Sequence, residues 1–171
     1  MADKNNIVLI GMPGAGKSTL GVVLAKILGY DFVDADILIQ NQTDRTLQKI
    51  IDALGPMGFI DVENDVLCDI DVRRTVISTG GSAVYSEEAM KHLSEIGTIV
   101  YLKVSLEELR ERLGGLHERG VVMKDGMGMS LEDLYAERTP LYERYAEITL
   151  ESDALTVRDA ARKLVDVLSL Q

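Results

Sequence analysis

The sequence predicts an α/β domain with a doubly wound parallel sheet. Short apolar runs alternate along the chain with segments of helical periodicity. Strands that are separated by helices of about 10–15 residues favour a parallel sheet covered on both faces. The length of 171 residues, 46% of them hydrophobic, suits one domain with a substantial core. Because no linker or internal repeat divides the chain, we expect a single domain over residues 1–171.

The predicted strands are short runs of apolar residues. The first run, NIVLI at residues 6–10, is apolar after its first position, as in a strand buried on both faces. Gly80 and Gly81 stop the third run. The expected strands are 6–10, 31–33, 76–78, 98–104 and 147–150.

The predicted helices are bounded by residues that start or stop helices. Gly29 ends the first helix, and Gly55-Pro56 separates the third from the fourth. Ser105 and Glu108 have the spacing of a capping box. The expected helices are 17–28, 36–42, 47–54, 57–70, 86–95, one that starts at Ser105, 131–145 and 156–170.

One stretch, residues 114–129, has no helical or strand pattern and contains five glycines. Long structureless segments are uncommon inside compact domains, and those that occur are usually lids or disordered excursions. We therefore expect a mobile lid over residues 114–129.

Composition excludes several classes of protein. The net charge of -10 repels nucleic acid and anionic membranes, so we expect neither as a partner. No apolar run approaches the roughly 20 residues that span a bilayer, and the first residues lack the pattern of a secretory signal. Cys68 is the only cysteine, which excludes an internal disulfide. These features predict a cytoplasmic protein, which we expect to be a monomer.

The segment from Gly11 to Ser18 fits the phosphate-loop pattern G-x-x-x-x-G-K-[ST]. The pattern needs a strand before it and a helix after it, and both are predicted. Its glycines let backbone N–H groups face phosphate oxygens, Lys17 adds positive charge, and the Ser18 hydroxyl suits Mg²⁺. The spacing is wrong for a dinucleotide site. The expected residues of this nucleoside triphosphate site are Gly11, Gly14, Ala15, Gly16, Lys17, Ser18 and Thr19.

Two further motifs follow predicted strands, where the acceptor of a phosphotransferase would bind. Asp34 and Asp36 follow the second strand, so one carboxylate can hold Mg²⁺ while the other orients or deprotonates an acceptor hydroxyl. The alternative is a helix N-cap. Gly80 and Gly81 follow the third strand and would let a substrate approach the backbone, although an ordinary turn has the same composition.

From Ile7 to about Leu168 the chain resembles the shikimate kinases. The resemblance rests on the phosphate loop and on four further motifs, which are Asp34-Ala35-Asp36, Ser78-Thr79-Gly80-Gly81, Arg112-Leu113-Gly114-Gly115 leading to Arg119, and Arg138-Thr139-Pro140-Leu141-Tyr142. It implies a P-loop NTPase fold with five parallel strands in the order 2-3-1-4-5 and a mobile lid. It also implies a kinase of aromatic amino acid biosynthesis that transfers the γ-phosphoryl group of ATP, with Mg²⁺, to a hydroxyl of shikimate.

The resemblance also implies a role for each matching residue. Lys17, Asp36 and Arg119 would be catalytic. On the donor side, Asp34 would contact magnesium, Arg112 the adenine and Arg119 the phosphates. On the acceptor side, Asp36 would contact the hydroxyl, Gly80 and Gly81 the body of the acceptor, and Arg138 its carboxylate. Without the resemblance, Arg112 and Arg138 could equally be exposed helix arginines, and Arg119 a mobile loop charge.

Three positions depart from the family pattern. Ile60 stands where an arginine would hold the carboxylate of shikimate, which leaves Glu63 without that partner. Ser82 replaces a third glycine, and Gly120 replaces a proline after Arg119. Removing one partner of a carboxylate–guanidinium contact costs about 2–5 kcal/mol. Candidates to replace the arginine are Arg45, Arg73 and Arg74.

Three hypotheses remain open at this point. The chain phosphorylates shikimate through a weakened or rebuilt site, or it phosphorylates another hydroxyl compound such as a polyol or nucleoside, or it binds nucleotide without transferring phosphate. The presence of Lys17, Ser18, Asp34 and Asp36 argues against the last. Ile60 predicts weak recognition of shikimate, with a KM above the usual range of about 1 μM–1 mM.

Overall fold

The computed structural model of the chain describes residues 4–117 and 130–169. At its centre is a sheet of five parallel strands in the order β2-β3-β1-β4-β5, which confirms the fold class and the strand order. The strands are β1 (Asn6–Ile10), β2 (Asp31–Asp34), β3 (Thr75–Ser78), β4 (Gly97–Lys103) and β5 (Ile148–Glu151). Every residue of the central strand β1 is buried, as its apolar sequence predicts.

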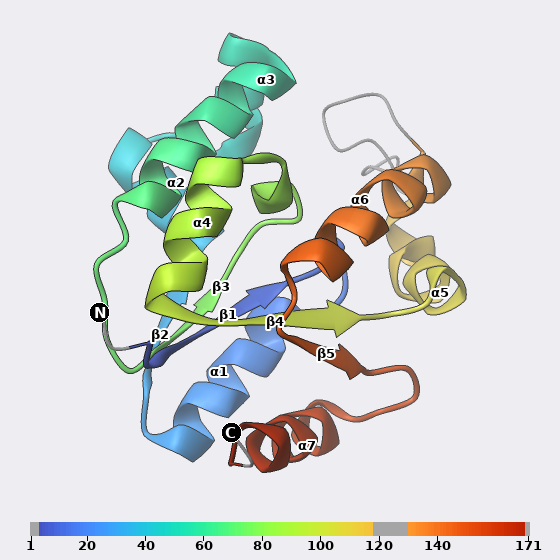
Figure 1. Cartoon of the computed structure of the whole chain (residues 1–171). Helices are drawn as coiled ribbons and strands as arrows, with labels where there is room; N and C mark the ends of the chain where they lie inside the picture. Colours follow the sequence, from blue (N-terminus) through green and yellow to red (C-terminus); the bar gives the residue numbers. More distant parts are fainter. Residues whose placement is uncertain (1–3, 118–129, 170–171) are drawn as a thin grey trace.

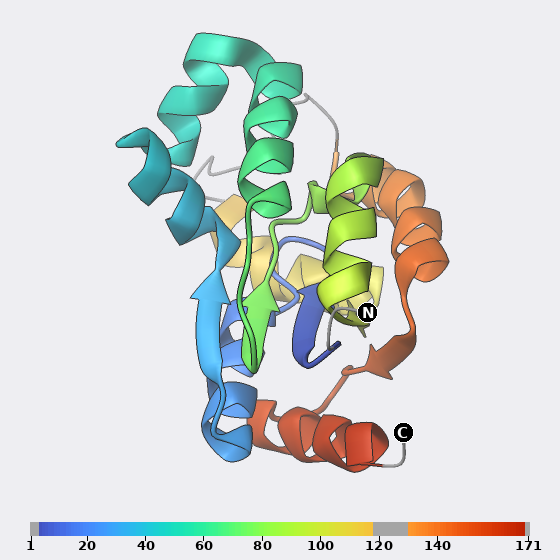
Figure 2. The ribbon, with the colours of Figure 1, turned by 60° about the vertical axis from the view of Figure 1, so that its left-hand side comes forward.

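Helices cover both faces of the sheet. α1 and α7 pack together on one face, and α4 and α6 lie on the other (Figure 1). α2 and α3 stand beyond the carboxyl end of β2 (Figure 2). The helices are α1 (Lys17–Leu28), α2 (Ala35–Thr43), α3 (Leu47–Cys68), α4 (Glu87–Ile96), α5 (Leu106–His117), α6 (Leu131–Tyr145) and α7 (Val157–Ser169), with a short 3₁₀ helix, η1 (Ala83–Tyr85).

The two helices expected on either side of Gly55-Pro56 together make up α3, which is broken at that point. Gly55 has the non-helical angles φ 72° and ψ 174°, and Pro56 lacks an N–H, so the expected separation at Gly55-Pro56 is confirmed. The second of these helices ends at Cys68 rather than at residue 70. α5 extends to His117, so residues 114–117 are helical rather than part of an irregular lid. The other residues of the expected lid, Arg119 and Gly120 among them, lie outside the described residues.

All five strands point the same way, so their carboxyl ends meet at one edge of the sheet. The phosphate loop follows β1 there, Asp34 ends β2, and Thr79 and Gly80 follow β3. Thr79 ties two of these ends together, because its hydroxyl donates to the carbonyl oxygen of Leu9 at 2.9 Å. The fold thus brings the predicted motifs to one edge. No helix in residues 4–117 and 130–169 is both long and apolar enough to cross a bilayer.

Candidate active site

The phosphate loop has a backbone that requires glycine. Gly11, Gly14 and Gly16 have φ of 151°, 80° and 91°, in the region that side chains rarely adopt. A Cβ at Gly11 would also lie 2.7 Å from the carbonyl oxygen of Leu102. Gly16 is the N-cap of α1, so the positive end of that helix faces the concave side of the loop.

Lys17 is buried within the curl of this loop. Its Nζ donates to the carbonyl oxygens of Gly11 at 2.7 Å and Met12 at 2.9 Å. Burial lowers the pKa of Lys17 to about 8, although the nearby Asp36 carboxylate opposes the shift. The side chain therefore still carries its positive charge at pH 7.

Ser18 and Asp34 form a small cluster of hard oxygen ligands. The Ser18 hydroxyl donates to Oδ2 of Asp34 at 2.6 Å and lies 3.2 Å from the Ser78 hydroxyl. Oδ1 of Asp34 accepts from the backbone N–H of Asp36 at 2.9 Å and of Ile37 at 3.3 Å. Asp34 is therefore the N-cap of α2 and at the same time presents its second oxygen to Ser18.

This cluster fits Mg²⁺ bound together with a triphosphate. Mg²⁺ prefers oxygen ligands, keeps several waters, and is usually held by one or two protein groups plus substrate phosphates. Ser18 and Asp34 can supply those protein groups. Across the described residues, no group of three or more His, Cys, Asp or Glu side chains is placed to hold a metal, so the site is not an all-protein metal cage.

Two carboxylates converge above Gly80. A Cβ placed on Gly80 would lie 2.8 Å from Oε2 of Glu63 and 3.0 Å from Oδ1 of Asp36. Burial raises the pKa of Asp36, and Asp34 adds to the effect. Burial raises the pKa of Glu63 to about 7 even though the Ser82 hydroxyl stabilises its ionised form. Glycine at position 80 therefore leaves room for both carboxylates, which a side chain there would crowd.

Arg138 lies next to the neighbouring glycine. Its side chain is fully buried, and one guanidinium nitrogen lies 2.8 Å from the position of a Cβ on Gly81. Its Nε donates to the Tyr85 hydroxyl at 3.1 Å, and its guanidinium lies over the Tyr85 ring, 5.1 Å from the centroid. Burial rules out an exposed helix arginine. Adjacent glycines thus have carboxylates beside one and a guanidinium beside the other.

A cavity of about 430 Å³ opens between the phosphate loop and α3. Lys17, Asp36 and Glu63 contribute polar groups to it, and Leu47, Ile51 and Phe59 form an apolar wall. Sequence reasoning missed Leu47 and Ile51. Their i, i+4 spacing shows that they share a helix face, but a face that lines a cavity has the same pattern as one that packs into the core.

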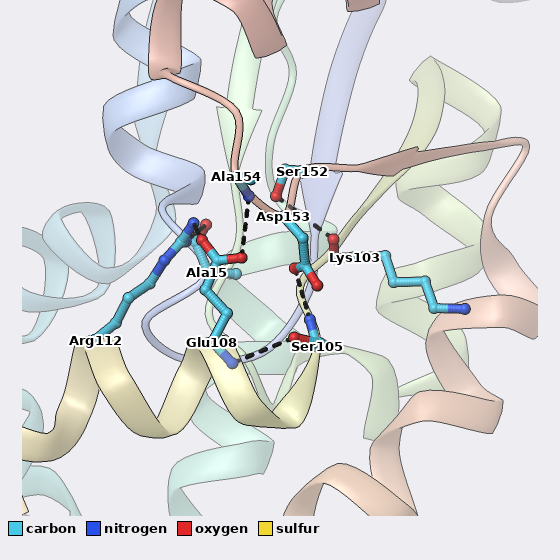
Figure 3. A network of polar contacts seen from close by, with 8 residues as sticks. All are labelled: Ala15, Lys103, Ser105, Glu108, Arg112, Ser152, Asp153 and Ala154. Atoms are coloured by element: carbon cyan, nitrogen blue, oxygen red, sulfur yellow. Dashed lines mark hydrogen bonds and ion pairs between the residues drawn. The ribbon is translucent and has the colours of Figure 1, made fainter.

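A second cavity, of about 240 Å³, lies on the other side of the phosphate loop. Arg112 and the segment after β5 line it. The Arg112 guanidinium donates to the carbonyl oxygen of Ala15 at 2.9 Å and to Glu108 at 2.6 Å (Figure 3). The two cavities share Gly14, Gly16 and Thr19. The phosphate loop therefore lies between two cavities.

The predicted capping box at Ser105 is only half formed. The Ser105 hydroxyl accepts from the N–H of Glu108 at 3.2 Å, as expected, but the N–H of Ser105 donates to Asp153 at 2.9 Å (Figure 3). The Glu108 carboxylate instead holds Arg112 and accepts from the N–H of Ala154 at 3.3 Å. Glu108 on α5 therefore connects Arg112, which lines the second cavity, with the segment after β5. The local capping-box pattern does not predict these contacts.

The structure also locates the departures from the family pattern. Ile60 is 8% exposed and is not among the described residues that line the first cavity. Ser82 donates its hydroxyl to Oε1 of Glu63 at 2.7 Å. Arg73 and Arg74 immediately precede β3, at the opposite end of the sheet, so the suggestion that either replaces the missing arginine is wrong. Arg45 is exposed in the turn between α2 and α3.

The fold and the site together define a P-loop phosphotransferase. A family model for shikimate kinase matches residues 13–169. The shikimate kinase of Pasteurella multocida is 39% identical over 170 residues, with 98% of this chain and 97% of the relative covered. That of Vibrio campbellii is 37% identical over 169 residues, with 98% of each covered. This chain belongs to the shikimate kinase family, whose members are ATP-dependent phosphotransferases that act on a hydroxyl group with Mg²⁺.

Solved structures agree with this assignment. The shikimate kinase of Acinetobacter baumannii in complex with shikimate has a TM-score of 0.87 at 32% identity, covering 98% of this chain and 94% of that chain. The shikimate kinase of Bacteroides thetaiotaomicron has a TM-score of 0.82 at 28% identity, covering 96% and 98%.

The raised pKa of Glu63 predicts a pH-dependent stability. Glu63 binds its proton more tightly in the folded protein, where its pKa is about 7, than in the unfolded chain, where it is 4.5. Its ionisation therefore lowers stability as pH rises through this window, by on the order of 3 kcal/mol. We expect Glu63→Gln to gain stability relative to the native protein between pH 5 and pH 8, measured by urea unfolding followed by circular dichroism. Identical pH dependence in both proteins would show that Glu63 titrates normally.

Proposed function

We propose that this chain phosphorylates shikimate, transferring the γ-phosphoryl group of ATP to one of its hydroxyls. The observation that carries the proposal is the pair of cavities that share Gly14, Gly16 and Thr19. A nucleotide bound beside Arg112 would place its phosphates in the loop and direct the terminal one towards the larger cavity. The acceptor would then meet that phosphate from the other side.

On the donor side, the proposed contacts follow from the loop geometry. The loop backbone and the N-terminus of α1 bind the phosphates, and Lys17 places positive charge against the β- and γ-phosphate oxygens. Ser18 and Asp34 would hold Mg²⁺, which would neutralise charge on the phosphate oxygens. Arg112, fixed by Glu108 and by the carbonyl of Ala15, would lie against the adenine.

On the acceptor side, charge is arranged to suit a hydroxy acid. Asp36 would orient the accepting hydroxyl and take its proton as the oxygen attacks phosphorus. Arg138, beside Gly81, would pair with the acceptor's carboxylate, while Gly80 and Gly81 leave space for the ring. The acceptor would therefore lie with its reacting hydroxyl near Gly80 and its carboxylate near Gly81.

The proposal is tested by identifying the product. We expect ³¹P NMR to show a new phosphate monoester resonance when the protein is incubated with Mg-ATP and shikimate, with one ADP formed per ester. Hydrolysis of ATP to inorganic phosphate without an ester would contradict the proposal and would favour a nucleotide-binding protein without transferase activity.

Ile60 gives a prediction about affinity. Since Ile60 lies one helical turn from Glu63 on α3, a guanidinium there could reach both Glu63 and the acceptor's carboxylate. We expect the native KM for shikimate to exceed about 1 mM and Ile60→Arg to lower it about tenfold or more, with little change in kcat. A carboxylate remote from the reacting hydroxyl is held similarly in the ground and transition states, so the gain should appear in KM. A sub-millimolar native KM would show that Arg138 suffices.

Some expectations are supported by the sequence alone. Arg119 lies outside the described residues, so its proposed contact with the phosphates rests on the resemblance alone. The monomeric state and the cytoplasmic location rest on the sequence.

A further inference from the structure

Ser82 and Glu63 form a polar pair in the wall of the larger cavity that the proposed transfer of phosphate does not use. Ser82 follows β3 and Glu63 lies on α3, and their side chains meet through a hydrogen bond of 2.7 Å. Glu63 is fully buried, and Ser82 is 7% exposed. This bond satisfies only one carboxylate oxygen, Oε1, and fixes the orientation of the group.

The other oxygen, Oε2, is buried and has no hydrogen-bond partner among residues 4–117 and 130–169. A buried carboxylate oxygen without a partner is costly, typically by 1–3 kcal/mol or more. Oε2 faces the space above Gly80, which Oδ1 of Asp36 borders from α2. A ligand group that donates hydrogen bonds in this space would satisfy Oε2, and it would do so immediately beside the carboxylate that we assign to the accepting hydroxyl.

We propose that Glu63, held by Ser82, hydrogen-bonds a second hydroxyl of the acceptor, adjacent to the one that Asp36 orients. This makes Glu63 a substrate contact and Ser82 its positioning residue. The site would then select acceptors with two neighbouring hydroxyls. The inference rests on the proposed function, because shikimate is a cyclohexene carboxylic acid with three hydroxyls on adjacent carbons.

The charges around Glu63 are consistent with this contact. Asp36 faces it and repels its ionised form, whereas Arg138 from α6 and Lys17 from α1 stabilise that form. A hydroxyl can bind Glu63 in either protonation state, because it can donate to a carboxylate and can also accept from a protonated carboxyl. A ligand carboxylate at the same place would instead meet two acidic groups.

The experiment measures kcat/KM for shikimate and for two analogues, each of which lacks one of the hydroxyls that do not receive phosphate. With the native protein, loss of the hydroxyl that contacts Glu63 should reduce kcat/KM by about tenfold to a hundredfold. In Glu63→Leu the same loss should cost threefold or less, because the contact is already gone. Ser82→Ala keeps the Glu63 carboxylate but removes the hydrogen bond that orients it. In this variant, removing the same hydroxyl from the substrate should reduce kcat/KM by an amount between those of the native protein and Glu63→Leu. Ser82→Ala serves as the second variant if Glu63→Leu is unstable.

A purely structural role would lower kcat/KM equally for shikimate and for both analogues, and that result would overturn the inference. If the native protein phosphorylates shikimate, but removing either hydroxyl costs the same in kcat/KM with and without Glu63, the inference is overturned and the proposed function stands. A native protein without activity on shikimate would overturn the proposed function and the inference together. The KM for ATP should stay unchanged in both variants, since neither residue lines the second cavity.

Discussion

Lys17→Ala should reduce phosphoryl transfer by on the order of a thousandfold, the largest effect that we expect from a single substitution. Lys17 is the only cation among the residues of the phosphate loop, and its Nζ lies on the concave side, within 2.9 Å of two loop carbonyls. An alanine leaves the loop's N–H groups and the α1 dipole in place. The terminal phosphate would therefore still bind but would lack the charge that stabilises its transfer.

The measurement is the rate of ADP release with saturating Mg-ATP and shikimate. Lys26→Ala is the matched control, because Lys26 is exposed on the same helix and should tolerate the change. A folded Lys17→Ala protein with near-native turnover would contradict the assignment of the phosphate site.

Asp36→Asn should lower kcat by a hundredfold or more while leaving the affinity for ATP almost unchanged. An amide keeps the shape of the side chain but cannot take the proton of the accepting hydroxyl. Asp36 borders the larger cavity, above Gly80, whereas Asp34 is the carboxylate that contacts Ser18. The structure therefore separates the two acidic residues by what each one touches.

Steady-state kinetics and equilibrium ATP binding together distinguish these roles. Asp31→Asn, at the exposed amino end of β2, should behave as the native protein does. If ATP affinity collapses in Asp36→Asn while bound substrate turns over normally, Asp36 belongs to the metal site and the division of roles is reversed.

Elements whose boundaries are set by their own residues or by adjacent ones could be predicted from the sequence. β1 and α1 begin and end where the NIVLI run, the loop glycines and Gly29 predict. The meeting of the phosphate loop, Asp34 and Gly80 follows from the rule that parallel strands share a carboxyl edge. The N-cap and metal interpretations of Asp34 do not exclude each other, because one of its oxygens accepts from the backbone of α2 and the other accepts from Ser18.

Contacts between distant segments could not be predicted from patterns. Ser82 and Glu63 are on different elements, and nothing in either local sequence indicates that they bond. Arg138 has the sequence surroundings of an exposed helical residue but is enclosed by Tyr85 and Gly81. The sequence does not place Arg74, whereas the structure puts it at the opposite end of the sheet from the acceptor site, over the ring of Tyr30.

The most direct test of the central claim is a coupled ADP-release assay with Mg-ATP against shikimate, a neutral polyol and a nucleoside at matched concentrations. A site with carboxylates beside Gly80 and a guanidinium beside Gly81 predicts that shikimate gives the highest kcat/KM of the three, even if its KM is high. A higher kcat/KM for the polyol or the nucleoside would contradict the claim that this chain is a shikimate-phosphorylating member of its family.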